Sequence, residues 1–70
     1  MEAQVSNPAL LPDLQAHLER MGCIAEVIAE DRLEVSIPDA PRRDVAELEL
    51  DLYLRLWEAT MPLGRAERVV

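Results

Sequence analysis

This 70-residue sequence has few of the residues that build catalytic centres or cross-linked folds. It contains one Cys, one His, one Trp, one Tyr, two Gly and no Phe. A single Cys cannot form an internal disulfide, and no cluster of Cys and His provides a structural zinc site. Gly22 and Gly64 are too far apart for a phosphate-binding loop. The sequence therefore predicts no cofactor and no metal, and its one free thiol agrees with a reducing compartment.

Long apolar runs and positive charge are also missing. No segment approaches the roughly 20 apolar residues that span a bilayer, and no charged leader precedes an apolar signal segment. Lysine is absent, and seven arginines face fourteen acidic residues, for a net charge of −7. Such a charge repels phosphate backbones and anionic lipids. We therefore expect a soluble cytoplasmic protein that binds neither nucleic acid nor membrane, and the Arg, Ala and Leu bias indicates a GC-rich bacterial genome.

The length allows one domain with a small core. At this size, folding buries only about 60% of the surface of the unfolded chain, so a core built by one chain alone is marginal. Self-association is the remedy that the composition leaves open.

Residues 44–61 are the most apolar segment, and two patterns in it conflict. Leucines alternate with polar residues, which is typical of a half-buried strand. The composition is nevertheless that of a helix, because no β-branched residue occurs between Ala46 and Ala59. Asp44 and Glu47 have the spacing of a capping box. The segment is therefore predicted to be a helix.

At about 100° per residue, this helix is apolar on two sides, so it must be buried nearly all round. The stripe predicted to face the core of its own chain contains Val45, Leu48, Leu52, Leu56 and Ala59. The opposite stripe, predicted to be a homodimer interface, contains Leu50, Tyr53, Leu54, Trp57 and Met61. On this interpretation Trp57→Glu separates the dimer into helical monomers, whereas a fully intramolecular core would make the same variant unfold.

The N-terminal part is predicted to be a disordered tail, residues 1–6, followed by a single domain, residues 7–70. A helix begins at Asn7-Pro8 or near Pro12 and ends at Gly22, which is well placed as its C-terminal cap. The apolar face of this helix contains Leu10, Leu11, Leu14, Leu18 and Met21.

Residues 23–38 carry the β-branched content of a hairpin, interrupted by Glu30-Asp31-Arg32. A two-residue loop puts Ile24 and Ile28 on one face with Leu33, Val35 and Ile37, and leaves Glu26 as the one misfit. A three-residue loop instead brings Cys23, Ala25, Val27 and Ala29 to that face. The first register is favoured because it buries more apolar volume.

Residues 65–70 are left between strand and coil; as a strand they would lie beside residues 33–37. The sequence thus predicts an α+β fold, a small two-layer α-β-β-α domain with or without a third, C-terminal strand. This order resembles a truncated ferredoxin-like arrangement, an analogy of topology that implies no function.

Candidate chemistry is sparse. His17 lies four residues after Asp13, within pairing distance, but no Ser or Thr is near in sequence and a surface or boundary position is expected. Cys23 follows a helix C-terminus, which disfavours the thiolate, so it is expected to be a buried apolar residue. The carboxylates do not converge on a metal, and Arg42-Arg43 is flanked by acids. No catalytic residues are predicted, and an enzyme is not expected.

Three functions remain as hypotheses. The first is a non-catalytic protein–protein interaction or regulatory module that forms a homodimer through its long helix. The second is a small-molecule binder or sensor with a pocket that uses Cys23 or His17. The third is an acidic decoy for a basic, nucleic-acid-binding protein partner.

Overall fold

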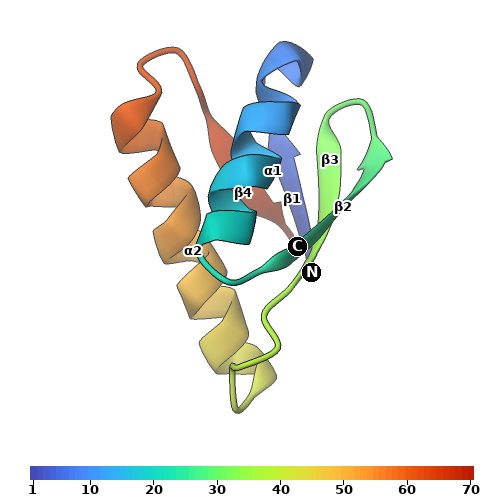
Figure 1. Ribbon diagram of the computed structural model, residues 1–70, viewed down its shortest axis with the longest axis vertical. Helices are drawn as coiled ribbons and strands as arrows, with labels where there is room; N and C mark the ends of the chain where they lie inside the picture. Colours follow the sequence, from blue (N-terminus) through green and yellow to red (C-terminus); the bar gives the residue numbers. More distant parts are fainter.

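The computed structural model describes all 70 residues and has the predicted α+β class. Four antiparallel strands form one sheet in the order β2-β3-β1-β4, and two helices pack on one face of it (Figure 1). The elements in chain order are β1 (Glu2–Val5), α1 (Leu11–Arg20), β2 (Ile24–Ala29), β3 (Arg32–Ser36), α2 (Arg43–Thr60) and β4 (Ala66–Val69).

The N-terminal residues form β1 rather than the predicted disordered tail. β1 lies between β3 and β4, in the middle of the sheet. Ala3 and Val5 point towards the helices and are 0% and 1% exposed. With β1 in place, the order β-α-β-β-α-β is the complete ferredoxin-like arrangement rather than the truncated one.

The C-terminal residues do form a strand, β4, but next to a different neighbour. β4 pairs with β1, with Ala3 opposite Arg68 and Val5 opposite Ala66. β4 does not lie beside β3, because β1 is already paired with that side of β3, with Ala3 opposite Leu33. The predicted neighbour was wrong because it was chosen without knowledge of β1.

The first helix has the predicted boundaries and punctuation. The Asn7 side chain accepts a hydrogen bond from the Ala9 N–H (3.1 Å) and starts a single 3₁₀ turn, Pro8–Leu10. α1 follows with Pro12 in its first turn, where the missing N–H costs no helical hydrogen bond. Gly22 has φ of +89°, the left-handed conformation that ends a helix.

The β2–β3 hairpin combines the favoured two-residue loop with the inward face of the disfavoured register, except that Ala29 pairs with Arg32. Glu30 and Asp31 form a two-residue turn, but a bulge at Ile28 then shifts the pairing by one residue. A shift of one residue exchanges the two faces of a strand, so Ala25 and Val27 share the face of Leu33 and the isoleucines point away. The same shift places Glu26 in solvent, and sparing a carboxylate from burial outweighs the apolar volume that is left exposed.

α2 is a helix, as its composition predicts, although its start differs from the prediction. Arg42 is the capping residue and makes no capping side-chain hydrogen bond. Asp44 lies inside the first turn and pairs with Arg42 (Nε to Oδ1, 3.3 Å) instead of closing a capping box with Glu47.

The chain closes its own core. The molecule exposes 4430 Å², and a folded monomer of 7.9 kDa is expected to expose about 4,400 Å². No helix combines the length and the apolar character needed to cross a membrane. The core is a single cluster from both helices and the inner face of the sheet: Ala3, Val5, Leu11, Leu14, Leu18, Cys23, Ala25, Leu33, Val35, Leu50, Leu54 and Trp57.

Substitution in β1 tests whether this segment is structural. Ala3→Asp places an unpaired charge in the core and is expected to lower the free energy of unfolding by about 3–5 kcal/mol. This is a large part of the total stability of a domain of this size, so most of the molecules should unfold. Glu2→Gln, on the opposite face, removes only an ion pair with Arg32 and should change the free energy of unfolding by less than about 1 kcal/mol. Urea denaturation followed by circular dichroism measures both. Equal tolerance of the two variants would contradict a central β1.

Candidate interaction surface

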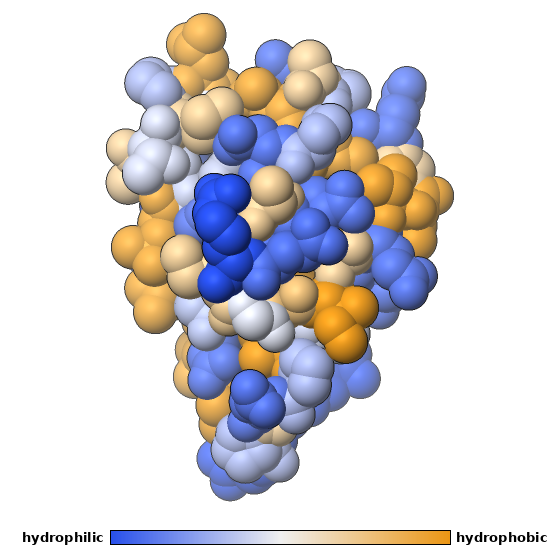
Figure 2. Space-filling model, in the orientation of Figure 1, coloured by the Kyte–Doolittle hydropathy of each residue, from blue (hydrophilic) through white to orange (hydrophobic).

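α2 presents two apolar faces, and only one of them is covered by the chain. Leu50, Leu54 and Trp57 face the sheet and α1 and are at most 2% exposed. On the other side Leu48, Leu52 and Leu56 are 70%, 53% and 45% exposed. We call these three residues the outer stripe; Figure 2 shows apolar surface along α2 at the left margin of the view.

The structure therefore exchanges the two predicted faces. The predicted core stripe, Val45, Leu48, Leu52, Leu56 and Ala59, has no buried member. The residues predicted as the interface lie in or against the core of their own chain: Leu50, Tyr53, Leu54, Trp57 and Met61. Leu50, Leu54 and Trp57 are enclosed and have no surface to offer to a second chain, whereas Tyr53 and Met61 are half-buried against the core.

The packing of Trp57 determines which side of α2 faces the sheet. The indole N–H donates to Asp13 Oδ2 on α1 at 2.8 Å. Gly64 lies against the ring, where a Cβ would be 2.8 Å from the nearest ring carbon. A glycine at this position leaves room for the indole, and the carboxylate satisfies the N–H that a buried Trp must pair.

Further hydrogen bonds hold α2 on both of its flanks. His17 on α1 contacts the carbonyl oxygen of Tyr53 through Nε2 at 2.9 Å. On the β4 side, Arg68 donates to Asp51 Oδ1 at 3.0 Å, and Glu58 accepts from the backbone N–H of Ala66 at 2.9 Å. With α1 and β4 both attached, α2 cannot turn the outer stripe inwards.

Charged residues lie along the outer stripe. Arg55 is exposed and forms no ion pair within the chain, whereas Arg43 pairs with Glu47 and Arg68 with Asp51. Glu49 lies on the other side of the stripe, where burial and, to a smaller extent, the Glu49 carboxylate raise the pKa of Tyr53. The surface is therefore an apolar strip between charged flanks, with one free cation.

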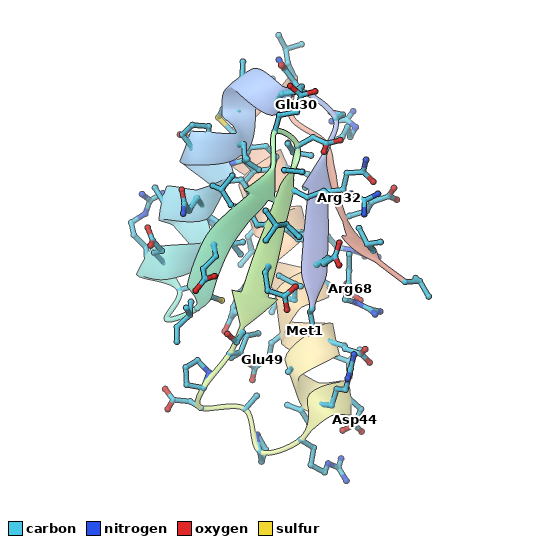
Figure 3. All side chains as sticks on the ribbon, turned by 90° about the vertical axis from the view of Figure 1, so that its right-hand side faces the viewer. Met1, Glu30, Arg32, Asp44, Glu49 and Arg68 are labelled. Carbon is cyan, nitrogen blue, oxygen red and sulfur yellow. The ribbon has the colours of Figure 1, made fainter.

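The open face of the sheet is acidic. Glu26, Glu34 and Glu2 lie side by side across β2, β3 and β1, and like charges in such positions repel. Arg32, labelled in Figure 3, lies on the same face and pairs with Glu2 at 3.2 Å. Glu26 forms no ion pair, and neither does Glu67 on β4.

The two residues considered for chemistry are parts of the core. His17 is 7% exposed, so it is buried rather than at the surface, and it does not bind Asp13, whose carboxylate accepts from Trp57. Cys23 is 6% exposed, as expected of an apolar cysteine, and burial raises the pKa of its thiol, with a smaller contribution from Glu49. Neither residue has the environment of a nucleophile.

No enclosed pocket accompanies these residues. The largest of four surface depressions, about 430 Å³, is open and mostly polar, and neither His17 nor Cys23 lines any of the four. No group of three or more His, Cys, Asp or Glu side chains converges as metal ligands would. The lining of the largest depression comprises Gln4, Val5, Ser6, Asp31, Glu58, Arg65, Ala66 and Glu67.

Comparisons with protein-family models, with curated proteins and with solved structures find no match to this chain. The outer stripe is therefore interpreted from its own geometry.

The bond between Asp13 and Trp57 can be tested by a double-mutant cycle. Asp13→Ala leaves the indole N–H without a partner and is expected to cost about 1–3 kcal/mol. In a Trp57→Phe background the N–H is already absent, so the same substitution should cost much less. Denaturation in urea, followed by circular dichroism, gives the four free energies. Equal costs in the two backgrounds would show that the bond does not stabilise the fold.

Proposed function

We propose that this protein is a small acidic, non-catalytic interaction module that self-associates through the outer stripe of α2. The observation that carries the proposal is the exposure of Leu48, Leu52 and Leu56 in one row, opposite a helix face that is fully buried. Solvent-exposed apolar rows rimmed by charge are typical of protein interaction sites. The homodimer expected from the sequence is thus kept, with its interface moved to the other side of the helix.

The energetics favour a weak, reversible dimer. Roughly half of each leucine is exposed, so burying six of them in a pair contributes about 5–9 kcal/mol. Association costs at least about 4 kcal/mol in lost freedom. The remainder is about 1–5 kcal/mol, and its upper end, which the proposal takes, corresponds to a dissociation constant of about 0.2 mM. A dimer of this strength responds to concentration, which suits a regulatory module better than a permanent scaffold.

Leu52→Glu tests the surface. Wild-type protein should approach twice 7.9 kDa in sedimentation equilibrium as its concentration rises to about 1 mM. The variant should remain a monomer with an unchanged circular dichroism spectrum, because Leu52 lies outside the core. Trp57→Glu should instead unfold at every concentration, since the indole is 1% exposed.

Ile24→Glu is the matched control, because Ile24 on β2 has the same 53% exposure as Leu52. It should leave the mass distribution of the wild type unchanged. A wild-type protein that stays monomeric up to about 1 mM, or a Leu52→Glu variant that associates as the wild type does, would refute the proposed surface.

The open face of the sheet supports a second candidate function, the acidic decoy. Glu2 and Glu34 are paired within the chain, with Arg32 at 3.2 Å and with the Met1 ammonium at 3.0 Å, so the unpaired charges of this face are Glu26 and Glu67, which a basic surface would neutralise. A partner of this kind is a basic protein surface that would otherwise bind nucleic acid.

Salt distinguishes the two functions. Binding to an immobilised basic peptide should weaken strongly between about 0.1 and 1 M NaCl, as the Debye length falls from about 10 to 3 Å. Self-association should not weaken, because salt screens the repulsion between two chains of −7 each. Replacing Glu26 and Glu67 together by Gln should reduce peptide binding more than Asp39→Asn, an exposed acid outside the sheet. Equal effects of the two changes would show that the peptide is attracted by the overall negative charge, which would refute the sheet face as the binding site.

A further inference from the structure

The outer stripe has a symmetry of its own. Leu48 lies four residues before Leu52 and Leu56 four residues after it, a spacing of about 6 Å along the helix axis in each direction. Val45 and Ala59 extend the same row by seven residues on either side of Leu52. A row that reads alike from both ends is self-complementary when a second copy runs in the opposite direction.

From this symmetry we infer that two α2 helices pair antiparallel, with the two-fold axis at Leu52, an arrangement that rests on the proposed self-association. Leu52 then meets Leu52 of the second copy, and Leu48 meets Leu56 of the second copy. Each large apolar side chain has a large apolar partner, and no leucine is left against a charge.

The charges beside the stripe favour the same direction. At about 100° per residue, Asp44, Asp51 and Arg55 lie on one flank and Glu49 on the other. In an antiparallel pair each flank faces the same flank of the second copy. Arg55, which has no ion pair within its own chain, then lies about 3 Å along the axis from Asp51 of the second copy. The two Asp51 carboxylates are equally close to each other, but each has Arg68 of its own chain and Arg55 of the second copy beside it.

A parallel pair brings opposite flanks together and loses this match. Arg55 then faces the flank of Glu49, but Glu49 lies six residues earlier, about 9 Å along the axis. Asp51 of one copy instead lies two residues, about 3 Å along the axis, from Glu49 of the other, which places two carboxylates together on each side of the pair. The charge pattern therefore opposes the parallel arrangement and supports the antiparallel one.

Disulfide trapping tests the direction. Cys23 is first replaced by Ala, and a single cysteine is then placed at position 48, 52 or 56 in separate variants. Circular dichroism checks that each variant is folded. Each is then mildly oxidised at a concentration where sedimentation shows association. Leu52→Cys should cross-link with itself. Leu48→Cys and Leu56→Cys should each cross-link at least about tenfold less alone, because like positions are about 12 Å apart along the axis and a disulfide needs less than about 7 Å. Mixing these two variants should restore the cross-linked product.

Each other outcome overturns a defined part of this account. Self-cross-linking of all three variants would show a parallel pair and refute the antiparallel direction while self-association stands. Association without any cross-linking, alone or in the mixture, would refute both the direction and the outer stripe as the interface. A wild type that is monomeric up to about 1 mM would refute the proposed function itself.

Discussion

The rotation of α2 about its own axis is the constraint on which the rest of the structure depends. The helix is apolar on two sides, so it could turn either stripe of leucines towards the sheet, and burial of either stripe would stabilise the fold by a similar amount. The indole of Trp57 removes this ambiguity, because it needs both a flat space and an acceptor for its N–H. Gly64 supplies the space and Asp13 the acceptor. Once the indole is seated, Leu50 and Leu54 cover the sheet and the outer stripe faces solvent.

The sequence predicted the two apolar stripes of α2 but not which of them faces solvent. Helix composition identified α2, and the helical period identified both stripes correctly. Which stripe is buried depends on residues outside the helix, since Asp13 precedes Trp57 by 44 positions. A usable signal was present, because a lone Trp in a core requires a hydrogen-bond acceptor. The four-residue spacing instead suggested His17 as the partner of Asp13, and the pairing of Asp13 with Trp57 was therefore missed.

The fold was predictable where its determinants are local. Capping residues and period defined α1, and β-branched content defined the hairpin, whereas two terminal valines left β4 open between strand and coil. β1 has only two inward residues, Ala3 and Val5, too few for a local pattern; its central place depends on pairing with strands about 30 and 65 positions away. The hairpin register failed for a related reason. Counting apolar volume favoured burial of Ile28, whereas the cost of burying Glu26 decides the bulge.

A chain that closes its own core has no structural need for a second copy. Its exposed area already equals that of an ordinary folded monomer, so the outer stripe contributes nothing to folding and becomes stabilising only when another molecule covers it. The acidic face of the sheet lies on the other side of the domain and stays open in such a pair. Helix pairing would double the number of acidic faces presented together, and two weak electrostatic contacts on one partner reinforce each other through effective concentration. The two candidate functions are therefore physically compatible, because association through α2 would strengthen binding through the sheet.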